Sequence, residues 1–422
     1  MFTKYKDRNG LITLSVSVEG AQVGNREILL HSKYDVIKEA KIFAENQIEN
    51  FKENNILYGF GLGYHVKELS KLMKDNQYLY VLDVRKDIYE YAVKNVELKE
   101  FLSKQNVKII IEEDIGVLCG HLAELLNIAD VHFFTYMPSV QIIPKEKEDF
   151  KLILESRDIR NNIKEETLQQ LNENYEYNKE NQHENIAVFF NKYKNVPGIL
   201  VSAGPSLDYA IPHLKALEEK TFIFSVGRAL KSLIKSAIVP NMFCIIDPQD
   251  ITGEQIEGLE DLHIPFVYLD TANYKTVNNY KGPKFVAVND IDHVGEENRK
   301  LLIDSGGSVS TAVLDMLIKF GCNPIIFVGQ DLAFQGSKHH AEGSLYEKEE
   351  KEVKVLKNMR TTEGIKGETL YTTLGLLSFK KWMENKISDN PHIKFINAST
   401  GGAKIKGTEY MDFAEVMDKY IK

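Results

Sequence analysis

The feature that most constrains the fold of this chain is a regular alternation of short apolar runs with segments of helical spacing. Four such runs occur between residues 54 and 138, and the alternation begins again at residue 198. Strands that alternate with helices build parallel sheets whose two faces are covered by helices. The predicted fold class is therefore α/β, with two Rossmann-like domains that contain mostly parallel sheets and are joined by helices. The runs of the second block cover residues 198–204, 221–227, 242–248, 265–272, 284–290, 324–332 and 392–400.

The chain has 422 residues, which exceeds what one hydrophobic core usually covers, so more than one domain is expected. Residues 1–50 alternate like a small β-hairpin followed by a helix, and residues 51–145 hold the first strand–helix block. Residues 146–195 are polar with helical spacing, which indicates a helical linker. The second block fills residues 196–422 and contains a long charged insertion at 335–370, which we interpret as a lid.

Charge and composition exclude several classes of protein. The formal net charge of -9 argues against a general nucleic-acid-binding protein, because such proteins carry a basic surface. The three cysteines lie far apart, which predicts free thiols in a reducing compartment. We find no signal-like apolar segment at the start and no apolar run long enough to span a bilayer. These observations predict a cytoplasmic protein with no nucleic-acid partner and no membrane insertion.

A first glycine cluster lies in the first strand–helix block. Gly59, Gly61 and Gly63 follow an apolar run and precede a helical segment, and Asp83 ends the next run. This order is typical of a nucleotide-binding Rossmann turn, in which an acidic residue contacts a ribose hydroxyl. Glycines in such turns also serve close packing. Two interpretations are therefore open: a cofactor site, or a scaffold or protein-docking domain. We favour the second.

A second set of polar and glycine residues follows the runs of the second block. Ligands of open α/β sheets bind outside the carboxyl ends of the strands, so these residues are expected to gather at one edge. Gly204 permits close approach of a ligand, and the amides that open the next helix face an anion, while the Ser206 hydroxyl is expected to cap that helix. The predicted contacts at this edge are Ser202, Gly204, Pro205, Ser206, Gly227, Asp247, Gln330, Asp331, Ser399 and Thr400.

A second helix start adds further candidates. Residues 305–311 read SGGSVST and precede a long helical segment, so their amides and hydroxyls are predicted to bind an anion. No Walker-type phosphate loop occurs. The residues expected to contact substrate here are Gly306, Gly307, Ser308, Ser310 and Thr311, with Thr372 after the lid.

The insertion contributes a candidate catalytic base. His340 follows Asp331 closely in sequence, and histidine accepts a proton from a hydroxyl near neutral pH. A zinc site is not expected, because no third ligand stands at a suitable spacing. We predict no required cofactor, although a divalent metal remains open.

Several of these segments together resemble a known family. SAGPSLD, GGSVSTAVLDMLIKFGCNPIIFVGQDLAF, HHAEG and FINASTGGAKIKG resemble the Maf (motility-associated factor) flagellin glycosyltransferases and their MptE-like relatives. They are more distantly similar to bacterial sialyltransferases. The resemblance covers roughly residues 195–410, and the 54–140 block looks like the N-terminal domain of Maf proteins.

The resemblance implies a sialyltransferase-like second domain, a GT-A variant without an Asp-x-Asp metal motif. It implies transfer of a nonulosonic acid, of pseudaminic or legionaminic type, from its CMP-activated form to Ser or Thr of flagellin. The amides and hydroxyls would then bind the donor's phosphate and carboxylate, Asp247 or Gln330 would bind the nucleoside, and His340 would deprotonate the acceptor hydroxyl. Asp331, the second predicted catalytic residue, would order the lid.

Two alternatives remain open at this point. One is an ATP-dependent 6-hydroxymethylpterin pyrophosphokinase, in which Asp247, Asp250 and Asp331 would hold Mg²⁺. The other is a non-catalytic flagellar accessory protein, whose second domain only holds a nucleotide.

Overall fold

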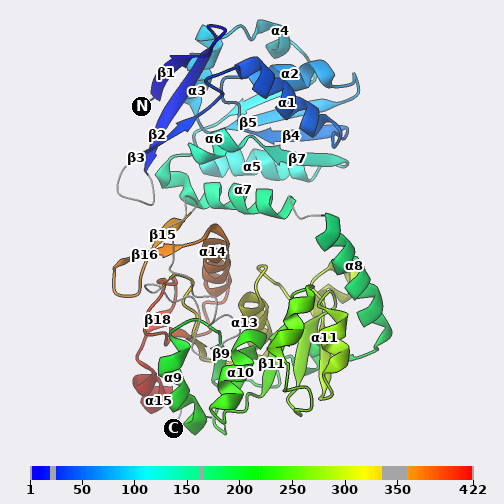
Figure 1. Ribbon diagram of the computed structural model, residues 1–422, viewed down its shortest axis with the longest axis vertical. Coiled ribbons are helices and arrows are strands. Elements are labelled where there is room, and N and C mark those ends of the chain that lie inside the picture. The colour runs from blue at the N-terminus through cyan, green and yellow to red at the C-terminus, as the bar shows by residue number, and fades with distance from the viewer. Residues whose placement is uncertain (1, 20–24, 162–164, 218, 335–358, 421–422) are drawn as a thin grey trace. The chain divides into compact units, whose positions relative to one another are not determined.

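The chain folds into two compact units. A computed structural model describes residues 2–19, 25–161, 165–217, 219–334 and 359–420. Unit 1 comprises Met1–Asn162 and unit 2 comprises Ile163–Lys422 (Figure 1). The division falls inside the segment 146–195 that the sequence marks as a linker. Helix α7 (Glu148–Asn161) belongs to unit 1 and helix α8 (Glu165–Glu180) belongs to unit 2.

Unit 1 is built on a four-stranded parallel sheet in the order β6-β5-β4-β7. One face packs on residues of α1, α2 and α3, and the other packs on residues of α5 and α7, as the alternating sequence predicts. The strands are β4 (Asn54–Tyr58), β5 (Tyr78–Asp83), β6 (Val107–Ile111) and β7 (Val131–Thr135). The helices are α1 (Val36–Ile48), α2 (Tyr64–Leu72), α3 (Lys86–Asn95), α4 (Lys99–Leu102), α5 (Ile115–Leu126) and α6 (Met137–Gln141).

The N-terminal segment adds a second, antiparallel sheet to unit 1. Its strands are β1 (Phe2–Lys6), β2 (Ile12–Glu19) and β3 (Asn25–Leu29). The sequence predicted a hairpin here, and the structure adds β1 as a third strand. β1 reads FTKYK and lies at the sheet edge, so it carries little of the apolar alternation that identifies a strand.

Unit 2 contains a nine-stranded sheet in the order β18-β17-β14-β9-β10-β11-β12-β13-β8. Every strand pair in it is parallel, which confirms the predicted fold class. The strands are β8 (Glu184–Asn185), β9 (Gly198–Val201), β10 (Phe222–Val226), β11 (Met242–Ile245), β12 (Phe266–Leu269), β13 (Lys284–Ala287), β14 (Ile325–Val328), β17 (Phe395–Asn397) and β18 (Glu409–Tyr410).

Helices cover both faces of this sheet. Residues of α13 (Val309–Phe320) and α14 (Leu374–Ser388) pack in one cluster with strand residues such as Leu200 and Phe327. The opposite face, which includes Val201 and Val328, packs against four other helices. These helices are α9 (Leu207–Leu214), α10 (Gly227–Lys235), α11 (Tyr274–Asn279) and α15 (Phe413–Tyr420). A short helix, α12 (Ile291–Val294), follows β13.

The order of strands reverses between β9 and β14. From β9 the chain adds β10 to β13 on one side, while β14, β17 and β18 lie on the other. Val201 pairs with Val328, so the residues that follow these strands leave the sheet side by side. Such a reversal is the place where open α/β sheets bind ligands.

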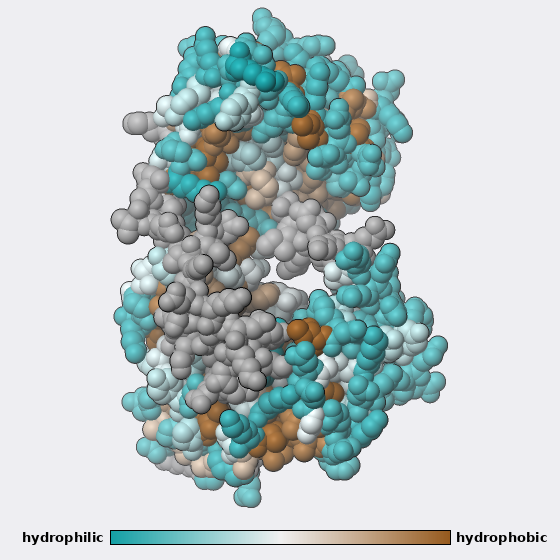
Figure 2. Space-filling model, in the orientation of Figure 1, coloured by the Kyte–Doolittle hydropathy of each residue, from teal (hydrophilic) through white to brown (hydrophobic). Residues whose placement is uncertain are grey.

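Part of the predicted lid lies outside the described residues. Within 335–370, the structure describes residues 359–370, including β15 (Arg360–Glu363), which pairs antiparallel with β16 (Thr369–Thr372). Residues 335–358 are not among those described. No helix within the described parts of the chain is long and apolar enough to span a membrane. Among the residues that Figure 2 colours, hydrophilic side chains predominate in each unit, and apolar side chains form separate patches.

Candidate functional site

The end of β14 and the start of α9 are joined by a buried carboxylate at the strand-order reversal. The Ser206 amide donates to Asp331 Oδ2 at 2.8 Å, and the Ser206 hydroxyl donates to Asp331 Oδ1. Asp331 is 3% exposed. The sequence led us to expect that the Ser206 hydroxyl caps α9. It does not cap the helix, and it donates to Asp331 instead. The position where a helix start would bind an anion is filled by the chain's own carboxylate.

Glycines around Asp331 allow this close packing. A Cβ at Gly204 would lie 2.5 Å from Asp331 Oδ2 and 2.5 Å from the Gly329 carbonyl oxygen. A Cβ at Gly402 would lie 2.5 Å from Asp331 Cα, and Gly402 has a φ of +92°. Gly204 thus brings the backbone close to Asp331 and Gly329. From the sequence, we predicted that a ligand would make this close approach at Gly204.

Three polar residues form a chain of hydrogen bonds at the same edge. The Ser202 hydroxyl donates to the side-chain Oε1 of Gln330 at 2.5 Å. The backbone amide of Gln330 donates to the Ser399 hydroxyl oxygen at 3.3 Å. Because Oε1 accepts from Ser202, the side-chain NH₂ of Gln330 is the group that this side chain would offer to a ligand at the reversal. Pro205 is buried there and Thr400 is partly exposed.

Backbone amides at the start of α13 also have hydrogen-bond partners within the chain. The amides of Gly306 and Ser308 donate to the Thr311 hydroxyl oxygen at 3.0 and 3.2 Å. The hydroxyls of Ser308 and Ser310 lie 3.2 Å apart. A Cβ at Gly306 would lie 2.5 Å from the Trp382 ring. The Gly307 amide donates to the Ser305 hydroxyl oxygen at 3.3 Å, and Ser310 is buried. The partly exposed Ser308 hydroxyl is therefore the group that this helix start offers to a ligand.

The third strand end places a carboxyl group near a guanidinium. Burial raises the pKa of Asp247 above its usual value, and the charge of Arg228 partly counters this effect. Gly227 packs against the Gln255 and Ile245 side chains, which a Cβ there would strike. Arg228 was not predicted as a site residue, yet its position in the first turn of α10 follows directly from the strand–helix pattern.

Thr372 and His340 complete the set of predicted residues. Thr372 has no exposed surface, and its hydroxyl donates to the Leu332 carbonyl at 2.8 Å, so it ties β16 to the segment after β14. His340, the predicted base, lies outside the described residues. Among the residues that the structure does describe, no group of three His, Cys, Asp or Glu side chains is arranged to hold a metal ion.

The glycine turn of unit 1 is filled by side chains of unit 1 itself. A Cβ at Gly59 would lie 2.7 Å from Ser139 Cβ, and one at Gly61 would lie 3.1 Å from His31 Nε2. Asp83 is 2% exposed and accepts the amides of Phe60 at 2.8 Å and of Arg85 at 2.9 Å. Asp83, the residue that would bind a ribose in a nucleotide site, thus forms hydrogen bonds that stabilise the turn.

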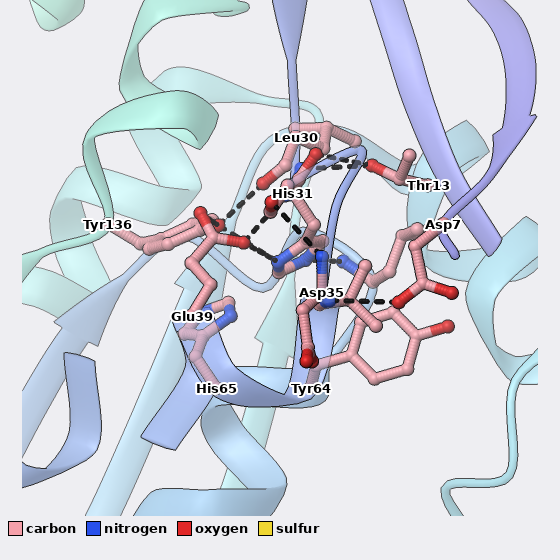
Figure 3. Close-up of polar contacts among 12 residues, drawn as sticks. Asp7, Thr13, Leu30, His31, Asp35, Glu39, Tyr64, His65 and Tyr136 are labelled. Carbon is pink, nitrogen blue, oxygen red and sulfur yellow. Dashed lines mark hydrogen bonds and ion pairs between the residues drawn. The ribbon is translucent and has the colours of Figure 1, made fainter. Parts of the chain in front are cut away.

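Aromatic and imidazole side chains complete this packing (Figure 3). The Tyr136 hydroxyl donates to the Leu30 carbonyl at 2.5 Å and lies 2.9 Å from His31 Nδ1. The His65 ring stacks on Tyr136 at 3.9 Å, and its Nε2 lies 2.9 Å from the Gly59 carbonyl oxygen. Burial lowers the pKa of His65 to about 3, so the ring is neutral. This turn packs like a scaffold, in line with the interpretation that the sequence favours.

Comparison with known proteins finds a match for part of unit 2. The family described as "6-hydroxymethylpterin diphosphokinase MptE-like" matches residues 169–337. This segment of unit 2 is therefore similar to that family. The matched segment includes the strand-order reversal, with Ser202, Ser206, Gln330 and Asp331.

A solved structure has a similar fold over nearly the whole chain. It is described as a Maf glycosyltransferase from Magnetospirillum magneticum AMB-1, and it matches with a TM-score of 0.51 at 14% identity. The match covers 97% of this chain and 70% of that one. The expected resemblance to Maf and MptE-like proteins is thus confirmed at the level of fold. No curated protein matches the chain.

Proposed function

We propose that this chain is a glycosyltransferase that moves a nonulosonic acid from a CMP-activated donor to Ser or Thr of flagellin. The observation that carries the proposal is the fold, which follows a Maf glycosyltransferase through both units and includes a segment similar to the MptE-like family. The polar residues of that segment gather at the strand-order reversal, where a donor would bind.

The described residues supply binding and orientation for such a donor. The Gln330 NH₂ would donate to a carbonyl or phosphate oxygen, and the Ser308 hydroxyl would meet negative charge on the leaving phosphate. Asp331 would hold the loop before α9 in place, rather than contact the donor with its carboxylate. His340 is the base that the sequence predicts, and it lies outside the described residues.

A second candidate function is favoured by the family description itself, which names a pterin diphosphokinase. The same edge carries Asp247 and Asp250, which would bind Mg²⁺ of an ATP complex. Asp250 already accepts from Lys275 at 2.9 Å and from Asn273 at 2.9 Å, which leaves it less suited to a metal ion. We therefore keep glycosyl transfer as the first proposal.

Ligand-induced thermal stabilisation separates the two functions, because a ligand that binds the folded state raises its melting temperature. We expect CMP to stabilise the protein and ATP with Mg²⁺ to leave it unchanged. Gln330→Ala should reduce the CMP shift, whereas Gln105→Ala, an exposed glutamine of unit 1, should retain it. Stabilisation by ATP with Mg²⁺ and not by CMP would favour the diphosphokinase instead.

A further inference from the structure

A buried aspartate and a histidine form a pair at the carboxyl edge of the unit 2 sheet. Asp270 directly follows β12 and is 4% exposed, and His293 lies in α12, after β13. His293 Nδ1 lies 2.5 Å from Asp270 Oδ2. A carboxylate at this distance fixes the tautomer, because it accepts the proton on Nδ1 and leaves the lone pair on Nε2.

Helix α8 closes over this pair. The Tyr175 ring stacks on the His293 ring with centroids 3.7 Å apart and planes 16° apart. Asn178 donates through Nδ2 to the Asp270 carbonyl at 2.9 Å and to the Ala272 carbonyl at 2.7 Å. The imidazole is thus clamped between a carboxylate and an aromatic face, which holds its orientation.

Two buried acceptors beside the pair have no donor. Asp270 Oδ1 and Asn178 Oδ1 are both inaccessible to solvent, and neither finds a partner among the described residues. An unsatisfied buried acceptor is costly, so each calls for a donor from outside this set. A buried water would supply one.

The second nitrogen of His293 remains available for chemistry. The hydrogen bond of the ring to Asp270 is made through Nδ1, which leaves Nε2 for a substrate, and the side chain keeps 20% of its surface exposed. The pair shares its sheet edge with the reversal, three strands along from β9. At the usual strand spacing this separates Asp270 from Ser202 by roughly 14 Å. Gln330 follows β14, one strand further from β12, so roughly 19 Å separates it from Asp270. A donor that binds at Gln330 and lies extended along the edge would have to span this distance to bring its sugar to His293.

We propose that His293, oriented by Asp270, is the proton acceptor for the attacking hydroxyl, an inference that rests on the proposed glycosyl transfer. The acceptor oxygen forms a bond to the anomeric carbon of the donor sugar. The bond from that carbon to the phosphate oxygen breaks, and its electron pair leaves with CMP. The hydroxyl proton passes to Nε2 and from there to solvent. His293 is then a catalytic residue, and Asp270 is a positioning residue.

The pair has a simpler structural role that the test must separate from catalysis. It anchors α12 to β12, and either substitution would loosen that contact. Burial raises the pKa of Asp270, the charge of His293 counters this effect, and the charge of Asp290 adds to it. Asp290 does not replace an imidazole as a neutral proton acceptor.

The test measures transfer to flagellin by the full chain against pH, for wild type, His293→Gln and Asp270→Asn. We expect kcat to fall by about 10²–10⁴-fold in His293→Gln, with CMP affinity unchanged and the loss of rate at low pH abolished. Added imidazole should restore part of the rate. His183→Gln is the matched control, because His183 Nδ1 lies 2.8 Å from the Tyr268 hydroxyl in the same unit. It should keep the wild-type rate.

Each outcome decides between the proposals. If wild type transfers sugar and His293→Gln retains its kcat and pH profile, His293 is not the base, and the fall in rate should then appear in His340→Ala. A fall in His293→Gln that is accompanied by equal loss of CMP binding and by a lower melting temperature would mean a structural role only. Absence of transfer by wild type would overturn the proposed function and this role together.

Discussion

The Asp331 carboxylate accepts hydrogen bonds from both the amide and the hydroxyl of Ser206, a residue 125 positions earlier in the chain. This contact closes the strand-order reversal, because it ties the segment after β14 to the start of α9. It also occupies the amide that would otherwise bind an anion. A phosphate could reach the Ser206 amide only if Asp331 moved away.

Removal of this carboxylate is predicted to destabilise unit 2. Asp331→Ala leaves the Ser206 amide and hydroxyl buried without an acceptor, which costs about 1–3 kcal/mol. Trp382 is the one tryptophan of the sequence and lies in α14, so its fluorescence reports urea unfolding of unit 2. The control is Ser388→Ala at an exposed position of α14, which should leave the midpoint unchanged. Equal midpoints for Asp331→Ala and wild type would show that the contact contributes no stability.

Gly204 is predicted to tolerate no side chain. The added Cβ of Gly204→Ala would overlap Asp331 and the Gly329 carbonyl, so we expect a loss of about 1–3 kcal/mol in the same unfolding assay. Gly253→Ala is the matched variant, because the nearest atom to its Cβ would lie 3.7 Å away. It should unfold like wild type. A wild-type midpoint in Gly204→Ala would mean that Asp331 does not hold this position.

The sequence predicts the strands of unit 2 well and their internal contacts poorly. Apolar runs ending in Ser202, Asp247 or Gln330 are local patterns, and they place these residues at one sheet edge. The bond from Ser206 to Asp331 joins residues far apart in sequence, and so does the packing of Trp382 over Gly306. No local pattern carries such contacts. Short polar edge strands such as β8 and β18 also escape prediction, because two residues show no period.

Asp247 is predicted to make unit 2 less stable at neutral pH. Burial raises its pKa above 3.8, so the folded state binds the proton more tightly than the unfolded state. Its contribution to stability is greatest below pH 3.8 and is lost as the pH rises through the raised pKa. Asp247→Asn should therefore match wild type near pH 3 and exceed it at pH 7 in urea unfolding. A variant less stable than wild type at pH 7 would mean that attraction to Arg228 outweighs burial.

The glycine turn of unit 1 is predicted to be structural. Gly61 has a φ of +53° and lies against His31, so Gly61→Ala should cost about 1–3 kcal/mol, measured by circular dichroism. Gly120→Ala in α5 is the contrasting control, because its Cβ meets nothing within 4 Å and alanine favours a helix. It should be neutral or stabilising. S-adenosylmethionine and NAD should give no thermal shift, and a shift abolished by Gly61→Ala would establish a cofactor site there.

Transfer of sugar is the central claim, and the intact mass of flagellin tests it most directly. Flagellin is incubated with the full chain and with CMP-activated pseudaminic or legionaminic acid, and its mass is then measured. The account predicts an increase by whole nonulosonic acid residues that depends on the chain and on the donor. Unchanged flagellin with both donors, together with AMP formation from ATP and 6-hydroxymethylpterin, would contradict it.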